Sequence, residues 1–271
     1  MAESDPYLLG YRRAEQERLE RQAEELAHES AWLFDQIGVR EGWRVVEIGC
    51  GPRGCLALLS ERVGATGRVI GVERSAEEVD RARQFVAASH LTNVEVLCAD
   101  GRATALPGGT FDLVTSRLVL VNVPEPKEIL TEMARLARLG GVVALHEADS
   151  TTQRIEPGHR AQDRLVELIA RYRVMSGIDP SIGLRVPRML REAGLTDVRV
   201  NALVHAYPPG HGRRMLLLDF VGNIRSRALE KGLIGAAELD ELVAALRAHL
   251  EDPGTLVVSS LFLQTWGRKP E

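Results

Sequence analysis

The feature that most constrains the fold is a regular alternation of two hydrophobic patterns between residues 44 and 147. Short runs rich in β-branched residues predict five strands, at 44–49, 68–73, 94–99, 111–116 and 142–147. Amphipathic segments among them predict helices at 55–63, 76–89 and 125–139. Strands joined through a helix pair in parallel by right-handed crossovers, which places helices on both faces of the sheet. The pattern therefore predicts a doubly wound α/β domain.

The flanking regions add further helices and two more strands. Apolar residues at three- and four-residue steps predict one long helix over residues 12–36, ended by Gly38. After residue 150 the patterns predict helices at 158–176, 185–193, 213–230 and 236–250, and strands at 197–206 and 255–266. Because helices separate these two strands, we expect a helical cap inserted before the last strand of a seven-stranded sheet.

Composition excludes several classes of protein. The formal net charge of the 271 residues is −4, so no general basic field attracts nucleic acid. The first residues are polar and charged, unlike a secretory signal, and no apolar run approaches the ~20 residues of a membrane span. The cysteines, Cys50, Cys55 and Cys98, lack metal-ligand partners at useful spacing. We therefore expect a cytoplasmic protein with no metal, no nucleic-acid partner and no membrane partner; the sequence leaves the oligomeric state open.

A glycine-rich loop follows the first predicted strand. Gly49, Gly51 and Gly54 form G-x-G-x-x-G, and Glu73 lies 73 − 54 = 19 residues further on, which is typical of a dinucleotide site. However, Glu47 ends the strand just before the loop. A carboxylate there would repel a diphosphate and would attract an α-ammonium or sulfonium group. The loop therefore favours an amino-acid-bearing cofactor, with an NAD(P)-dependent oxidoreductase as the alternative.

Five segments then resemble, in order, the motifs of class I S-adenosylmethionine-dependent methyltransferases. They are VVEIGCG, GVERS, CADGRATALP, FDLVTSRLVLVNVPEP and EMARLARLGGVVALHE, and they extend from about Gly42 to Glu147. Two positions depart from the family pattern. Arg53 stands where the family commonly has a third glycine, and Leu139 stands where proline usually precedes the glycine pair. The side chain of Arg53 must therefore point away from the cofactor.

The resemblance implies S-adenosyl-L-methionine as cofactor, with S-adenosyl-L-homocysteine as product. It implies that Glu73 binds the ribose hydroxyls, a geometry that suits a carboxylate, and that Asp100 binds the adenine amino group. Arg117 has three alternatives: it binds the methionine carboxylate, bridges to the cap, or pairs with a surface acid. The residues expected to contact the cofactor are Tyr11, Gln22, Glu47, Gly49, Cys50, Gly51, Glu73, Arg74, Asp100, Gly101, Arg102, Ser116 and Arg117.

The chemistry leaves the catalytic residues less defined. Methyl transfer from a sulfonium needs the nucleophile, methyl and sulfur nearly in line, so positioning supplies much of the acceleration. A general base is needed only for a poorly acidic acceptor. His146 and Glu147, at the end of the fifth predicted strand, are the candidate bases, with Asp149 nearby. His205 and His211 lack a visible partner and are not included among the candidates.

The sequence as a whole predicts a Rossmann-like, mostly parallel seven-stranded fold with three regions. These are an N-terminal helical lid (1–40), a cofactor-binding core (41–150) and an acceptor-side region holding the cap and the last two strands (151–271). We expect methyl transfer to a small-molecule O-, N- or C-nucleophile, of the kind found in bacterial secondary or quinone-type metabolism. Besides the oxidoreductase, the alternative is a non-methylating protein that binds S-adenosylmethionine.

Overall fold

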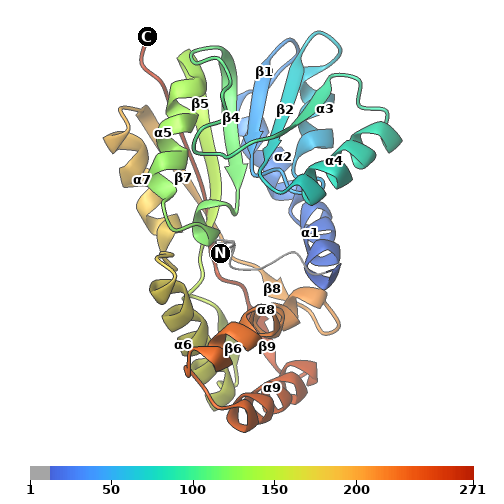
Figure 1. Ribbon diagram of the computed structural model, residues 1–271, viewed down its shortest axis with the longest axis vertical. Helices are drawn as coiled ribbons and strands as arrows, with labels where there is room; N and C mark the ends of the chain where they lie inside the picture. Colours follow the sequence, from blue (N-terminus) through green and yellow to red (C-terminus); the bar gives the residue numbers. More distant parts are fainter. Residues whose placement is uncertain (1–12) are drawn as a thin grey trace.

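The computed structural model describes residues 13–271, which form an upper sheet half and a lower helical cap (Figure 1). The upper half holds a seven-stranded sheet in the order β3-β2-β1-β4-β5-β10-β7. Its strands are β1 (Arg44–Ile48), β2 (Arg68–Glu73), β3 (Val94–Cys98), β4 (Phe111–Arg117), β5 (Ala137–Asp149), β7 (Thr196–Leu203) and β10 (Leu261–Arg268).

The strand pairing confirms the predicted fold class. β1 pairs in parallel with β2 and with β4, and β2–β3 and β4–β5 are also parallel. β10 lies antiparallel between β5 and β7, so a single strand reverses direction in the sheet. Because β1 and β4 are neighbours although β2 and β3 intervene in the sequence, the chain order reverses at β1. Such a switch point places a crevice at the carboxyl ends of the strands.

Helices cover both faces of the sheet because adjacent strand residues point to opposite sides. Val45 belongs to one hydrophobic cluster and Val46 to the other. The first cluster packs α2 (Ala27–Ile37), α3 (Leu56–Val63) and α4 (Ala76–Ala88) against the sheet, and the second packs α5 (Pro126–Leu136) and α7 (Ile182–Glu192). Strands buried on both faces explain the nearly continuous apolar runs of the sequence. Ser75 caps the start of α4, because its Oγ accepts a hydrogen bond from the Glu78 amide at 3.4 Å.

The cap has its own hydrophobic core and a small sheet that the sequence analysis missed. Its elements are β6 (Arg154–Glu156), α6 (Arg160–Met175), β8 (Ala206–Tyr207), the 3-10 helix η2 (Gly212–Met215), α8 (Leu216–Glu230), α9 (Ala236–Glu251) and β9 (Leu256–Val258). The small sheet has the order β6-β9-β8. The cap therefore also draws on the segment between β5 and α7, not only on the insertion before the last strand.

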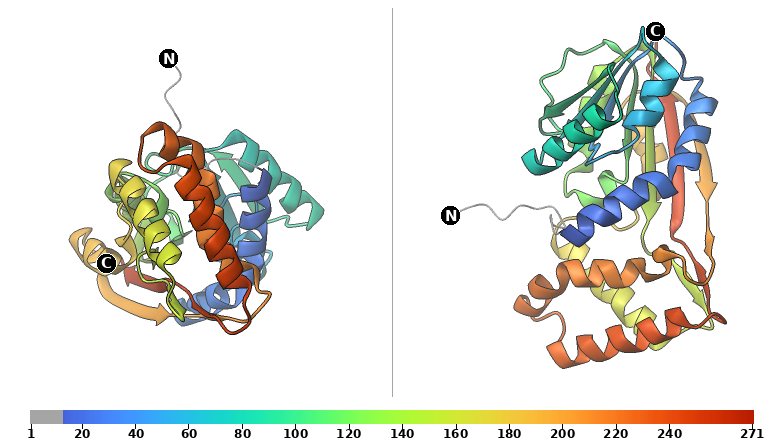
Figure 2. Two further views of the ribbon diagram at one scale, coloured as in Figure 1. Left: turned by 90° about the horizontal axis from the view of Figure 1, so that it is seen from below. Right: turned by 90° about the vertical axis from the view of Figure 1, so that its right-hand side faces the viewer.

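Several predicted boundaries are wrong for local reasons. The single helix expected over 12–36 is α1 (Arg13–Glu25) and α2, which meet at the buried Leu26. This bend lets α2 pack on the sheet while α1 crosses toward the cap (Figure 2). The strand expected at 255–266 is divided into β9 and β10, and that at 197–206 into β7 and β8, because each chain passes from the large sheet to the small one. The helix expected at 125–139 ends at Leu136, where β5 begins.

Candidate active site

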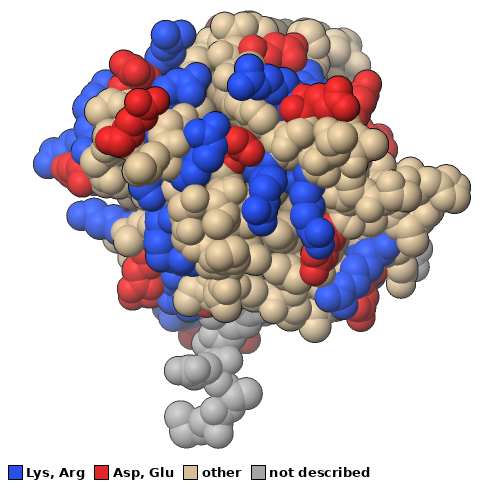
Figure 3. Space-filling model, turned by 90° about the horizontal axis from the view of Figure 1, so that it is seen from above, with Lys and Arg blue, Asp and Glu red and all other residues tan. Residues whose placement is uncertain are grey.

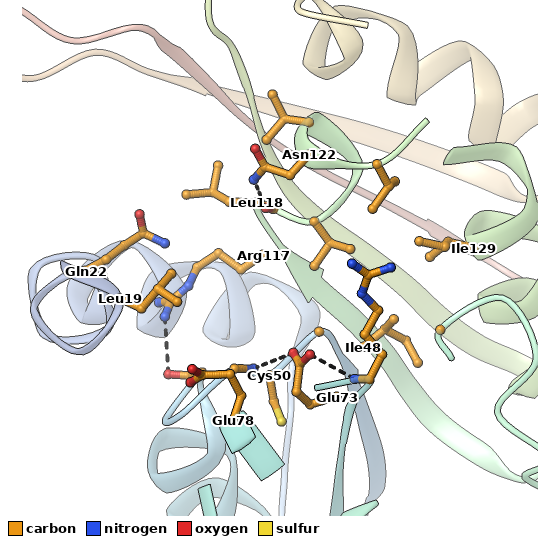
Figure 4. Close-up of a pocket in the computed structure, with 18 of the residues that line it drawn as sticks. Leu19, Gln22, Ile48, Cys50, Glu73, Glu78, Arg117, Leu118, Asn122 and Ile129 are labelled. Carbon is orange, nitrogen blue, oxygen red and sulfur yellow. Dashed lines mark hydrogen bonds between the residues drawn. The ribbon is translucent and has the colours of Figure 1, made fainter. Parts of the chain in front are cut away.

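A cleft opens between the carboxyl ends of the parallel strands, α1 and the cap. In Figure 4, Leu19 and Gln22 of α1 lie on one side, and Glu73 and Cys50 lie near the strand ends. Most of the predicted cofactor residues line this one cleft: Gln22, Glu47, Gly49, Cys50, Gly51, Glu73, Arg74, Asp100, Gly101, Arg102 and Arg117. Ser116, His146 and Glu147 do not line it. Tyr11 lies outside the described residues.

The glycine loop is built over the carboxylate of Glu47. Both Glu47 oxygens accept a hydrogen bond from the Cys55 amide, at 2.9 and 2.8 Å. Gly54 has φ +50°, and a Cβ there would stand 2.5 Å from Glu47 Oε2 and 2.8 Å from the Cys50 carbonyl oxygen. Burial raises the pKa of Glu47 to about 7, and the charge of Arg117 partly offsets this. Glu47 therefore supports the loop directly while also facing the cleft.

The loop is open where a ligand would approach it. Gly51 has φ +54°, and no atom lies within 4 Å of the position that its Cβ would take. The side chain of Arg53 turns away from this space. Its guanidinium forms a 2.7 Å ion pair with Glu24 and lies 5.2 Å from the centre of the Phe85 ring. The bulky residue at the family's glycine position therefore leaves the loop accessible.

Three backbone amides hold the carboxylate of Glu73 in place. Oε1 accepts from the amides of Arg74 (2.8 Å) and Ser75 (3.0 Å), and Oε2 accepts from Gly51 (3.2 Å), as Figure 4 shows in part. Each carboxylate oxygen has two lone-pair directions, so Oε2 retains acceptor capacity on the cleft side. A carboxylate fixed in this way fits a ligand that presents hydroxyl groups.

Asp100 lies at the same edge, but it is strongly paired. Its carboxylate accepts several hydrogen bonds from Arg102, the shortest at 2.7 Å, and these bonds lower its pKa. Arg102 also binds Glu125 at 2.8 Å. The guanidinium of Arg102 is therefore already neutralised by carboxylates, and Asp100 must share its lone pairs with Arg102 to bind an adenine amino group.

Arg117 connects α2 to the glycine loop. Its Nη1 donates to Ser30 Oγ of α2 at 3.0 Å, and its Nη2 donates to the carbonyl oxygen of Gly54 at 3.2 Å. Within residues 13–271 no carboxylate lies at ion-pair distance from it, so pairing with a surface acid is the wrong alternative. A cation that lines the cleft without an acidic partner remains available for an anionic ligand group.

Glu147, expected as a candidate base, is fully buried and anchors the segment that follows β4. Its carboxylate accepts the amides of Val119 (3.1 Å), Leu120 (2.9 Å) and Val121 (3.1 Å). Burial raises its pKa to about 7, and the three amides partly offset the rise. Val119 and Val121 line the cleft, whereas Glu147 does not. The geometry therefore corrects the expectation of a base: Glu147 shapes one wall of the cleft from behind.

His146 and Ser116 are also buried behind the cleft. The His146 ring packs edge-on against Phe262, with 5.5 Å between centroids, and neither ring nitrogen has a hydrogen-bond partner among the described residues. Burial and the nearby Arg117 charge lower the pKa of His146 to about 3. Ser116 is 1% exposed, and its hydroxyl likewise has no partner in the described part of the chain. These positions favour packing roles for both side chains.

The buried, neutral His146 makes stability depend on pH. From pH 7 to pH 5, we expect the free energy of unfolding of the wild type to fall by about 2 kcal/mol more than that of His146→Phe. The unfolded chain takes up a proton near the ordinary pKa of 6.5, whereas the folded histidine stays neutral down to about 3. Acid therefore stabilises the unfolded state. Urea unfolding of both proteins at the two pH values measures the difference, and equal losses would contradict it.

Sequence reasoning missed the cap side of the cleft. There the lining includes Arg18, Ser150, Arg173, Arg213, Phe220 and Phe262. One signal was available: Leu165, Ile169 and Arg173 recur every four residues, so an arginine occupies the apolar stripe of a predicted helix. Within the described range, no group of three or more His, Cys, Asp or Glu side chains is arranged to hold a metal ion. None of its helices is both long enough and apolar enough to cross a bilayer.

The topology and the cleft define a class of protein: a Rossmann-like fold with a cleft at the carboxyl ends of its parallel strands. Residues 46–145 match the family described as "Methyltransferase domain". This match agrees with the resemblance of the five sequence motifs to class I S-adenosylmethionine-dependent methyltransferases. This match supports S-adenosylmethionine as the cofactor and disfavours the nicotinamide alternative.

Two curated relatives and one solved structure illustrate the likeness. A demethylmenaquinone methyltransferase of Shouchella clausii is 36% identical over 132 residues, covering 47% of this chain and 55% of that protein. A trans-aconitate 2-methyltransferase of Azoarcus is 36% identical over 138 residues, covering 51% of each. The chain thus spans about half the length of the curated relatives it matches. A putative methyltransferase from Bacillus halodurans has a TM-score of 0.62 at 16% identity, covering 89% of this chain and 98% of that one, which shows a shared fold.

Proposed function

We propose that this protein transfers a methyl group from S-adenosylmethionine to a small-molecule acceptor. The observation that carries the proposal is the Glu73 carboxylate, which three backbone amides fix beside a glycine loop with open space at Gly51. A ribose diol matches such a carboxylate, since two hydroxyls can donate to it. The family match over residues 46–145 supports the same ligand.

The remaining candidate contacts follow from their places along the cleft. We assign Glu73 to the ribose hydroxyls, Asp100 to the adenine amino group and the glycine loop to the methionine portion. Arg117, which lacks a carboxylate partner in residues 13–271, is assigned to the methionine carboxylate. The ionised form of Glu47 would favour the positive groups of the same portion. When bound, the cofactor supplies an electrophilic methyl group on a cationic sulfur.

The residues of the chain would act mainly by position. His146 and Glu147 do not face the cleft, so no base is assigned to either. Methyl transfer is accelerated mostly by holding the acceptor in line with the reacting methyl and by excluding water. In this proposal residues 1–40, of which 1–12 lie outside the described part of the chain, form a lid. Residues 41–150 bind the cofactor, and the cap within 151–271 encloses the acceptor.

A small molecule suits the cleft better than a nucleic acid does. On the face shown in Figure 3, lysine and arginine are interspersed with aspartate and glutamate. The formal net charge of −4 adds no general attraction for phosphates. The names of the two curated relatives, which refer to demethylmenaquinone and to trans-aconitate, support small acceptors and leave quinone-type metabolism as one candidate setting.

Calorimetry tests the cofactor assignment. Glu73→Ala should weaken binding of S-adenosylhomocysteine by about 10- to 150-fold, the effect of losing hydrogen bonds worth about 1.5–3 kcal/mol. The matched control is Glu95→Ala on the neighbouring strand β3, because Glu95 pairs with Arg68 at the surface, away from the cleft. Wild-type affinity in Glu73→Ala would remove Glu73 from the site, and preferential binding of NAD would overturn the proposal.

Turnover is tested separately with S-adenosylmethionine that carries a labelled methyl group and a panel of small hydroxyl, amine and carbon nucleophiles. Transfer of label to a panel member supports the proposal. Retained S-adenosylhomocysteine binding with no transfer to any acceptor would instead favour the non-methylating alternative.

A further inference from the structure

An unusual cation lines the cap end of the cleft. Arg173 of α6 is 2% exposed, yet it borders both the cleft and a smaller cavity under the cap. The two cavities share Ser150, Phe220 and Phe262. Arg173 is therefore buried from bulk solvent but faces enclosed space.

The hydrogen bonding of Arg173 is incomplete. Its Nη1 donates to Ser150 Oγ, which in turn donates to the carbonyl oxygen of Pro180 at 2.9 Å. Its Nε has no partner, and within residues 13–271 no carboxylate lies at ion-pair distance. Its guanidinium lies 5.7 Å from the centre of the Phe220 ring. Burial alone lowers its pKa to about 10, so it is still charged at neutral pH.

Another buried arginine of the cap shows how a structural one is satisfied. Arg214 is also 2% exposed, and its three nitrogens donate to the carbonyl oxygens of Leu250, Tyr207, Asp252 and Thr255 at 2.7–3.1 Å. A buried charge without such compensation is costly. The contrast indicates that the missing partner of Arg173 is a ligand from outside the chain.

The surrounding charges also favour an anion. Arg18 of α1 flanks the same Phe220 ring, 5.6 Å from its centre, and Arg213 is paired with Glu25. Asp149, at the end of β5, accepts hydrogen bonds from Thr151 (2.7 Å) and Ser181 (3.1 Å). Three arginines thus border this end of the cleft, and the identified carboxylates there are already bonded.

We propose that Arg173 binds a carboxylate or phosphate group of the methyl acceptor, so that the acceptor is a small organic anion. The identification of the anion as the methyl acceptor rests on the proposed function, whereas the anion-binding site itself does not. Phe220 and Phe262 pack against the apolar part of the molecule. Arg173 lies at the cap end of the cleft, and the strand ends that would bind the cofactor lie at the opposite end. An anion held by Arg173 therefore directs the rest of the acceptor toward the cofactor. It is a positioning contact, in keeping with the absence of an assigned base.

The test uses three ring compounds that differ in charge: benzoate, phenyl phosphate and neutral benzamide. Dissociation constants are measured by ligand-observed NMR titration of the full chain, with and without S-adenosylhomocysteine. We expect at least one anion to bind about tenfold or more tightly than benzamide, consistent with charged hydrogen bonds. The tighter of the two anions distinguishes a carboxylate from a phosphate acceptor.

Substitutions then assign the effect to one side chain. Arg173→Met should weaken anion binding by about tenfold or more while leaving benzamide and S-adenosylhomocysteine affinities unchanged. Arg171→Met, at an exposed position of the same helix, should change none of them. Arg173→Lys keeps the charge and should recover part of the anion affinity that Arg173→Met loses. If Arg173→Met does not fold, Arg173→Lys is tested in its place.

Two results would overturn the inference. One is equal binding of benzamide and both anions to the wild type. The other is unchanged anion affinity in a folded Arg173 variant. Either result with normal S-adenosylhomocysteine binding leaves the proposed function intact. Conversely, Arg173-dependent anion binding in a protein that does not bind S-adenosylhomocysteine would support the anion site and overturn the methyltransferase proposal.

Discussion

Glu147→Ala is expected to lower the free energy of unfolding by at least about 3 kcal/mol, because it leaves buried amides unsatisfied at about 1–3 kcal/mol each. The wild-type carboxylate accepts the amides of Val119, Leu120 and Val121 in a fully buried position. Since Val119 and Val121 line the cleft, the surviving folded protein should also bind S-adenosylhomocysteine less tightly. Urea unfolding and calorimetry measure the two effects.

Glu147→Gln is the matched control, because it keeps the volume and one acceptor oxygen. Its loss of stability should be smaller than that of Glu147→Ala. The comparison should also depend on pH: the folded-state pKa of Glu147 is raised from 4.5 to about 7, so ionisation on going from pH 5 to pH 8 destabilises the wild type. The advantage of the wild type over Glu147→Gln should therefore shrink by about 2 kcal/mol over that range. Equal stability of the alanine and glutamine variants at every pH would contradict the anchoring role.

Gly54→Ala is expected to cost about 2–6 kcal/mol of stability and to reduce cofactor affinity. The cost combines a left-handed backbone conformation, about 1–3 kcal/mol, with overpacking, also about 1–3 kcal/mol. The added methyl would stand 2.5 Å from Glu47 Oε2 and 2.8 Å from the Cys50 carbonyl oxygen, so the glycine loop must move. Thermal unfolding and S-adenosylhomocysteine binding measure the consequences.

Gly109→Ala separates the backbone cost from the steric one. Gly109 also has a positive φ, +67°, but nothing lies within 4 Å of the position of its Cβ. This variant should lose only the backbone contribution and should keep the affinity of the wild type. If Gly54→Ala behaves like Gly109→Ala, then packing of the loop over Glu47 does not determine the cofactor site.

The sheet half was predictable because its signals are local. The apolar runs, the glycine loop and the acidic residues at the ends of β1 and β2 stand in consecutive segments. The small sheet β6-β9-β8 was not predictable, because its strands have only two or three residues and pair across long intervals of sequence. Short runs of this kind carry almost no periodic pattern.

The two halves of the candidate site differ in the same way. Eleven predicted residues line the cleft, mostly from motifs at strand ends. His146 and Glu147 were misplaced because the predicted strand stopped at residue 147, whereas β5 continues to Asp149 and pairs with Leu261 of β10. Arg18, Arg173 and Arg213 belong to three distant segments, which meet only after the cap folds over the sheet.

The way the chain builds the cap has a consequence for how solutes enter. The polypeptide crosses between the halves four times: after β5, before α7, after β7 and before β10. Four covalent tethers resist rotation of the cap as a rigid body. The helix α1, in contrast, joins the described remainder of the protein through one junction at Leu26. Noncovalent contacts, among them the ion pairs of Glu24 with Arg53 and of Glu25 with Arg213, hold α1 across the cleft, so we expect hydrogen exchange of the α1 amides to report any opening of the entrance.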